Sequence, residues 1–199
     1  MFVAWAGAIL MVASSFVYSV VMLSLSRLKR TTLPPAPTGR RALTAGTASD
    51  EDFVVFLIPC LNEGRVIGAS MERLQALPQD NWCVLVIDDG SDDDTASIVE
   101  SFSDDPRINL MRRVAPNARQ GKGEALNAAV ELISGGHLIG DRDPARVIVA
   151  ILDADGRLER QTIDEVLPYF ADEKVGGVQI GVRINNRHSS VLARMQDFE

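Results

Sequence analysis

From Phe53 onward, apolar runs rich in β-branched and aromatic residues alternate with segments whose apolar residues recur three or four positions apart. The runs predict buried strands, and the recurring positions predict helices that pack with one face. Alternation of the two is typical of an α/β protein with a mainly parallel, three-layer sheet. The predicted strands are 53–58, 82–87, 108–112, 147–152 and 175–182, and the predicted helices are 65–77, 95–102, 124–134 and 161–170.

Prolines and glycines modify three of these elements. Pro59 is expected to end the first strand, and Pro168 to bend or end the last helix. Three glycines weaken the strand at 175–182, and a further helix is expected to begin at Ser189. The run at 147–152 has no polar position, which predicts a strand buried on both faces.

The first 26 residues carry no charged side chain, and Arg27, Lys29 and Arg30 follow at once. At about 1.5 Å per residue, a helix of this length crosses a hydrocarbon core of roughly 30 Å. A cleaved signal peptide would begin with basic residues, and a soluble helix would present a polar face. We therefore expect a transmembrane anchor over 1–26 in the cell membrane, a Pro-rich cytoplasmic linker over 27–52 and a cytoplasmic domain over 53–199.

Composition narrows the possible functions. Of the 199 residues, 46% are hydrophobic, which is enough for a folded core, and a net charge of −7 leaves no electrostatic case for binding nucleic acid. Cys60 and Cys83 lie in apolar strand-like runs and are expected to be buried free thiols of a reducing compartment. His137 and His188 have no second ligand at metal-binding spacing, so we interpret both as loop residues.

Polar or acidic residues follow three predicted strands: Asn62-Glu63, Asp88-Asp89 and Asp153-Ala154-Asp155. Right-handed crossovers place the carboxyl ends of parallel strands on one edge of the sheet, where such sheets bind ligands. Paired carboxylates there suit a hard divalent cation that also holds a diphosphate. At Asp153 the alternative is a solvated turn that ends in Gly156, whereas an EF-hand loop is excluded because the glycine comes too early.

Two further segments carry candidate chemistry. A carboxylate of Asp88-Asp89 can accept hydrogen bonds from a nucleobase or a ribose, while Ser91 to Asp94 can cap the helix that follows. Gly121-Lys122-Gly123 precedes another helix, where a lysine can face a diphosphate; a flexible basic loop is the alternative. It is not a Walker A loop, because a glycine follows the lysine. The first strand is not followed by G-x-G-x-x-G, which argues against a nicotinamide or flavin enzyme.

Four segments, 56–63, 86–91, 121–127 and 152–155, occur in the order seen in family 2 glycosyltransferases of GT-A fold, which the chain resembles over about 53–183. Its N-terminal anchor resembles the membrane-bound branch, which includes cellulose, chitin and hyaluronan synthases. The resemblance implies inverting transfer of a sugar from a nucleotide sugar, usually a UDP-sugar, to a polysaccharide or lipid acceptor, with Mg²⁺ or Mn²⁺. It implies metal binding by Asp153 and Asp155, and nucleotide-sugar binding by Pro59, Asn62, Glu63, Asp88, Asp89, Lys122 and Asp153.

The family also has features that are missing from this sequence. They are a catalytic-base carboxylate in a Thr-Glu-Asp or Glu-Asp motif, a Gln-x-x-Arg-Trp motif and further transmembrane helices. We therefore expect 53–199 to be the donor-binding N-terminal part of a truncated glycosyltransferase domain, with the base beyond Glu199. One alternative is a membrane-tethered nucleotide-sugar-binding module without catalysis. Another, a partner-binding anchor without a ligand, leaves the acidic strand ends unexplained.

Overall fold

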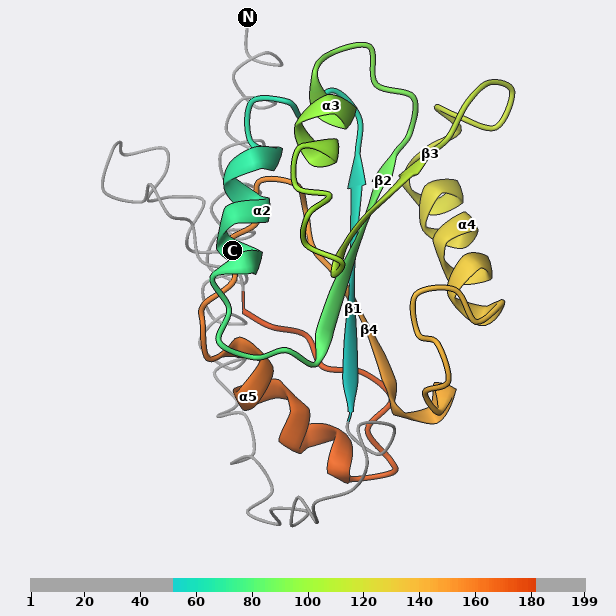
Figure 1. Ribbon diagram of the computed structural model, residues 1–199. Helices are drawn as coiled ribbons and strands as arrows, with labels where there is room; N and C mark the ends of the chain where they lie inside the picture. Colours follow the sequence, from blue (N-terminus) through green and yellow to red (C-terminus); the bar gives the residue numbers. More distant parts are fainter. Residues whose placement is uncertain (1–51, 182–199) are drawn as a thin grey trace, which may run out of the picture. The chain divides into compact units, whose positions relative to one another are not determined.

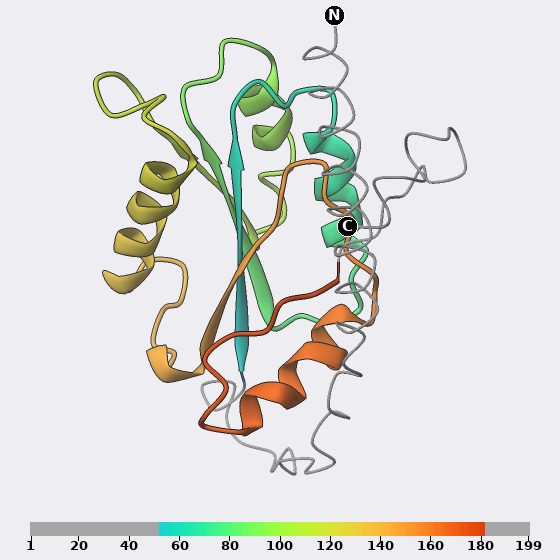
Figure 2. The same ribbon diagram turned by 180° about the vertical axis from the view of Figure 1, so that it is seen from behind.

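The computed structural model describes residues 52–181, and Figures 1 and 2 show it from two sides. The predicted anchor at 1–26, the linker up to residue 51 and the helix expected from Ser189 lie outside these residues. Between residues 52 and 181, none of the helices combines the length and the apolar character that a membrane span requires.

Within the described residues, four parallel strands form one sheet in the order β3-β2-β1-β4. They are β1 (Phe53–Cys60), β2 (Trp82–Asp88), β3 (Ile108–Arg112) and β4 (Val147–Ile151). Leu57 of β1 lies opposite Leu85 of β2 and Ile151 of β4, so the carboxyl ends of these strands share one edge. The predicted mainly parallel α/β sheet is confirmed.

Helices cover both faces of this sheet (Figures 1 and 2). Successive residues of β1 point to opposite faces, so Phe56 and Ile58 belong to one core and Val55 and Leu57 to the other. The first face carries α2 (Ile67–Gln75), α3 (Thr95–Glu100) and α5 (Thr162–Val166), and the second carries α4 (Lys122–Ser134). There are also two short 3-10 helices: η1 (Pro144–Arg146) precedes β4, and η2 (Leu167–Ala171) follows α5.

The cores are built from the predicted apolar positions. Ile67, Met71 and Leu74 share one face of α2, and each is at most 2% exposed. The two cysteines are buried and free, as predicted. Burial raises the pKa of the Cys60 thiol to about 12 and that of Cys83 to about 11, so neither thiol is a nucleophile at neutral pH.

The topology identifies where a ligand would bind. The chain adds β2 and then β3 on one side of β1, and α4 then returns over the opposite face to place β4 on the other side of β1. The order of the strands therefore switches between β1 and β4. Open α/β sheets bind ligands at the carboxyl ends of the strands beside such a switch.

Pro59 does not end β1, contrary to the prediction. It lies inside the strand, opposite Ile87 of β2. Pairing between β1 and β4 stops at Leu57, so Pro59 has a strand on one side only, where a missing N–H is tolerated. The prediction for Pro168 is confirmed, because α5 ends at Val166 and the chain tightens into η2 around the proline.

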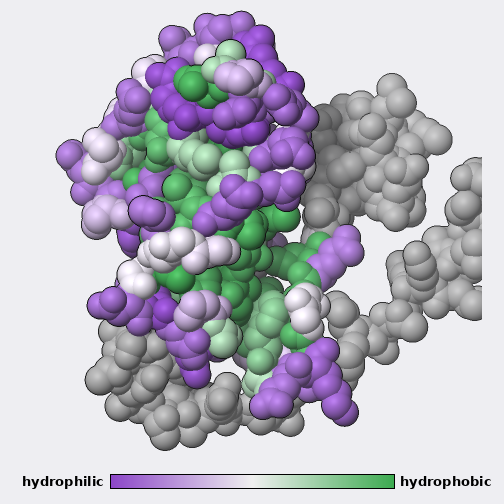
Figure 3. Space-filling model, turned by 90° about the vertical axis from the view of Figure 1, so that its right-hand side faces the viewer, coloured by the Kyte–Doolittle hydropathy of each residue, from purple (hydrophilic) through white to green (hydrophobic). Residues whose placement is uncertain are grey.

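The run at 147–152 is not buried on both faces, so that prediction is wrong. Val149 is 42% and Ile151 59% exposed, because β4 is an edge strand of the described sheet and α4 covers it only in part. Figure 3 shows hydrophobic residues at the surface on the side of α4, where Val130, Ile133 and Val149 help to line a groove of about 280 Å³. The run's composition indicated a strand correctly but could not indicate how many neighbours it has.

The strand expected at 175–182 is not formed by the residues that the structure describes. Residues 175–181 have neither helical nor strand backbone. The three glycines in this stretch explain the difference, because glycine loses more backbone entropy than other residues and adds no side chain to pack in a strand.

An ion pair within the turn before β3 is joined to α2 by a hydrogen bond. The Nη2 and Nε groups of Arg107 donate to the two carboxylate oxygens of Asp105 at 2.8 and 3.0 Å, and Gln75 of α2 donates to the same carboxylate at 3.3 Å. The Arg107 guanidinium also lies 4.3 Å from the ring centroid of Trp82. The hydrogen bonds from Arg107 lower the pKa of Asp105 to about 2.

Asp105→Asn is expected to destabilise the protein at neutral pH and to lose this effect in acid. The folded-state pKa lies below the value of about 3.9 in unfolded chains, so ionised Asp105 stabilises the fold above about pH 4. That contribution is lost as the pH falls through about 2. Urea midpoints of the wild type and Asp105→Asn should differ at pH 7 and converge between pH 4 and 2. Asp104→Asn, at an exposed neighbouring position, is the control; a gap for Asp105→Asn that does not change with pH would contradict the expectation.

Candidate functional site

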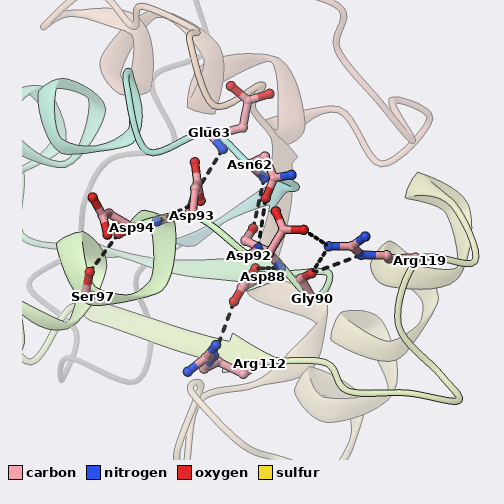
Figure 4. Close-up of polar contacts among 12 residues, drawn as sticks. Asn62, Glu63, Asp88, Gly90, Asp92, Asp93, Asp94, Ser97, Arg112 and Arg119 are labelled. Carbon is pink, nitrogen blue, oxygen red and sulfur yellow. Dashed lines mark hydrogen bonds and ion pairs between the residues drawn. The ribbon is translucent and has the colours of Figure 1, made fainter.

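The three acidic or polar segments predicted to share one edge of the sheet do share it. Asn62-Glu63 follows β1, Asp88-Asp89 ends β2, and Asp153 follows β4, all at the carboxyl ends of parallel strands. Figure 4 shows how the first two segments come together with the start of α3. This edge lies beside the switch in strand order between β1 and β4.

Asn62 ties the end of β1 to the turn after β2. Its backbone N–H donates to Ser91 Oγ at 2.9 Å, and its side-chain Oδ1 accepts from the N–H of Asp92 at 3.0 Å (Figure 4). Asn62 has a φ of 60°, in the left-handed region that asparagine enters more readily than most residues. Asn62, which is predicted to bind a nucleotide, therefore holds the turn after β2 against the end of β1.

Glu63 and Gly64 are held by the start of α3. The N–H of Glu63 donates to Thr95 Oγ1 at 2.9 Å, and the N–H of Gly64 donates to Asp93 Oδ2 at 3.0 Å. Asp93 also accepts from the N–H and the hydroxyl of Thr95, and the Thr95 hydrogen bonds lower the pKa of Asp93. Asp94 is the N-cap residue of α3 and makes no side-chain cap hydrogen bond, so among the residues predicted to cap the helix Asp93 contributes only its contact with Thr95. The Glu63 carboxylate points away from the turn (Figure 4).

The adjacent aspartates at the end of β2 have different environments. Asp88 is fully buried, and both its oxygens are engaged: Oδ1 by the N–H of Ser91 at 2.8 Å and Oδ2 by Arg112 Nε at 3.2 Å. Asp89 Oδ1 accepts from Arg113 Nη1 at 2.5 Å, whereas its Oδ2 has no protein partner in the described residues. Asp88 thus holds the turn, and Asp89 retains an oxygen for a ligand.

The sequence interpretation did not identify Arg112, Arg113 and Arg119. The side chains of Arg113 and Asp89 are each only 8% exposed, so their ion pair is buried. Arg119 donates twice to the Gly90 carbonyl, at 2.8 and 3.1 Å, and pairs with Asp92 at 3.0 Å, which folds the segment after β3 against the turn after β2. The pairing register of β3 against β2 would have identified Arg112, because this residue lies directly opposite Asp88 on the neighbouring strand.

Lys122 and Asp153 join the start of α4 to the end of β4. Lys122 is the first residue of α4, after Gly121 with a φ of 107°. Its Nζ lies 2.5 Å from Asp153 Oδ1, and both side chains are more than half exposed. The first turn of α4 has no side-chain cap, so its N–H groups remain available to an anion.

Asp153 and Asp155 flank a residue that anchors their turn to the core. Ala154 is buried, and its carbonyl accepts from Ser70 Oγ of α2 at 2.6 Å. The N–H of Gly156 donates to the Asp153 carbonyl at 2.8 Å, so the turn ending in glycine is real. Both aspartates face solvent, and Asp155 has no hydrogen bond or ion pair with the described residues.

The two aspartates can supply part of a metal site. Across 52–181 there is no place where three histidine, cysteine or acidic side chains converge as ligands. Mg²⁺ in proteins is commonly held by one or two carboxylates together with substrate phosphates and water, so a pair is a sufficient protein contribution. In the structure, Asp153 forms an ion pair with a cationic group, the ammonium of Lys122. The donor set therefore fits a hard divalent cation that arrives with a phosphate ligand.

The fold and this edge together define the class of the protein. It is a parallel α/β domain with acidic residues at the ends of β2 and β4 and a lysine at the start of α4, beside a topological switch point, where such sheets bind ligands. The model of Glycosyl transferase family 2 matches residues 55–198, and the chain belongs to this family. The predicted family is thereby confirmed, while its membrane-bound branch stays a prediction.

Similar proteins include two named synthases and one solved transferase. The chain is 30% identical over 178 residues to beta-monoglucosyldiacylglycerol synthase of Synechocystis sp., covering 87% of this chain and 34% of that protein. It is 28% identical over 152 residues to poly-beta-1,6-N-acetyl-D-glucosamine synthase of Staphylococcus aureus, covering 73% and 32%. The mannosyltransferase PcManGT of Pyrobaculum calidifontis, in complex with GDP-Man and Mn²⁺, superposes with a TM-score of 0.60 at 26% identity, over 89% of this chain and 48% of that one. The chain thus spans about a third of the length of these curated relatives.

Proposed function

We propose that this chain forms the donor-binding part of an inverting glycosyltransferase that uses a UDP-sugar and a divalent cation. The observation that carries the proposal is the meeting of Lys122 with Asp153, beside the unpartnered Asp155, at the carboxyl edge of the sheet. One cationic and two anionic groups at a helix start are suited to a diphosphate and its metal. The GDP-Man and Mn²⁺ held by the mannosyltransferase support a nucleotide sugar and a metal here.

In this proposal each part of the edge has one role. Asp153 and Asp155 would hold Mg²⁺ or Mn²⁺, which neutralises charge on the departing nucleoside diphosphate. Lys122 and the open first turn of α4 would face the diphosphate. The free oxygen of Asp89 would accept a hydrogen bond from the nucleoside, and the hydrogen-bonded turn at Asn62 would orient that group.

The acceptor and the location are proposed from the relatives and the first residues of the chain. One relative is named for the synthesis of a glycolipid and another for that of a polysaccharide, so we propose a lipid or polysaccharide acceptor. We propose that residues 1–26 anchor the protein in the membrane with the site in the cytoplasm, on the basis of the uncharged stretch and the basic residues after it. No residue among those described is assigned as the catalytic base.

Calorimetry on the full chain in a nonionic detergent tests the donor site. UDP should bind in the presence of Mn²⁺ or Mg²⁺ and much more weakly with EDTA, because the metal bridges carboxylates and diphosphate. GDP is the comparison ligand, since it carries the same diphosphate on another base. Equal affinity for UDP with metal and with EDTA would rule the proposal out. Tighter binding of GDP than of UDP would mean that the donor is a GDP-sugar and not a UDP-sugar.

A further inference from the structure

The ion pair between Lys122 and Asp153 is short although both side chains are exposed to solvent. Lys122 Nζ lies 2.5 Å from Asp153 Oδ1, yet the two side chains are 54% and 69% exposed. Exposed pairs are weak, typically worth no more than about a fivefold change in an equilibrium constant. The pair therefore neutralises Asp153 without fixing Lys122 in place.

The surroundings of Lys122 leave it room to move. It is flanked by Gly121 and Gly123, and a Cβ added to either glycine would meet no other part of the protein within 4 Å, apart from the adjacent residues and the backbone of α4 itself. The other carboxylate of the turn that carries Asp153, that of Asp155, has no partner in the described part of the chain. One of the two proposed metal ligands thus carries a counter-charge, and the other does not.

Resting on the proposed function, we propose that Lys122 is an internal counter-cation that holds the place of the metal at Asp153 until a nucleoside diphosphate arrives. The ammonium occupies Oδ1 of Asp153 and repels an incoming divalent cation. A diphosphate at the start of α4 offers Lys122 a stronger partner, so the lysine leaves Asp153 as the nucleotide binds. Lys122 thereby couples the two ligands, and metal and nucleotide each strengthen binding of the other by the same factor.

The coupling gives the site a functional advantage. A free divalent cation binds weakly to the empty edge, because Lys122 already satisfies one carboxylate. The metal is taken up efficiently only together with the diphosphate whose charge it must neutralise. Lys122 acts here as a positioning residue, since it controls the availability of Asp153 for the metal.

Titration of the full chain with Mn²⁺ in nonionic detergent, followed by the EPR signal of free Mn²⁺, tests the inference with and without UDP. Lys122→Met keeps the aliphatic stem and removes the charge. It should bind Mn²⁺ without UDP about three- to tenfold more tightly than the wild type, from the loss of one nearby positive charge. UDP should strengthen Mn²⁺ binding markedly in the wild type and less in Lys122→Met.

Two variants serve as controls. Lys122→Arg keeps the charge and should retain weak binding of Mn²⁺ without UDP. Arg160→Met removes an exposed positive charge after the turn and should stay within about twofold of the wild type, because salt screens distant charges. Circular dichroism of each variant verifies the fold.

The outcomes separate this inference from the proposed function. If Lys122→Met binds Mn²⁺ no more tightly than the wild type, or if Lys122→Arg binds it as tightly as Lys122→Met, the counter-cation role is wrong. The proposed function would survive either result, provided that UDP still strengthens Mn²⁺ binding in the wild type. If UDP has no effect on Mn²⁺ binding in the wild type, the donor site and the inference are both overturned.

Discussion

Asp155→Asn is expected to remove the metal dependence of UDP binding and to leave the fold unchanged. Asp155 is exposed and has no partner among the described residues, so its replacement breaks no stabilising contact. It would nevertheless take away one of the two carboxylates proposed to hold the metal. The dissociation constant for UDP in Mn²⁺ should rise by at least about tenfold, to the value that the wild type shows with EDTA, because Asp155 would supply one of the two carboxylates through which the metal links UDP to the protein.

Glu159→Gln is the matched control for Asp155→Asn. It removes one negative charge from an exposed residue four positions further along the chain, outside the strand end. Calorimetry should show UDP binding close to that of the wild type for Glu159→Gln, and thermal unfolding should be the same for all three proteins. Should Asp155→Asn retain the metal dependence of the wild type, the metal would have to bind elsewhere.

The central elements could be predicted because their side-chain pattern has one structural solution. A continuous apolar run such as 82–87 can be buried only between helices on both faces, and β2 is buried throughout. The parallel arrangement then follows from the alternation with helices, and it brings the acidic strand ends to one edge. The exposure of Val149 and Ile151 in β4 could not be predicted. The same apolar sequence can form an edge strand or a central strand of a sheet.

The different roles of Asp88 and Asp89 could not be predicted from their identical chemistry. Adjacent residues at a strand end point to opposite sides, so each carboxylate meets a different arginine. Which arginine it meets depends on the register of β3 against β2, where Arg112 lies opposite Asp88. A motif of two aspartates therefore predicts the position of a site but not which aspartate is structural and which is open to a ligand.

Arg113→Met is expected to lower the free energy of unfolding by about 3–5 kcal/mol, because it leaves the carboxylate of Asp89 buried without its partner. Both side chains are 8% exposed, so water can replace little of the lost interaction. Urea unfolding followed by circular dichroism measures the loss. Arg119→Met, which breaks an ion pair between exposed side chains, should change stability little and serves as the control.

The double variant Arg113→Met/Asp89→Asn separates stability from recognition. Removing both charges removes the uncompensated carboxylate, so much of the lost stability should return. Affinity for UDP should stay below that of the wild type, because the amide oxygen of asparagine is a weaker acceptor for the proposed nucleoside contact than the carboxylate of Asp89. If the double variant recovers both stability and UDP affinity, the pair has a structural role only. If Arg113→Met costs no more than Arg119→Met, the buried pair does not hold the end of β2.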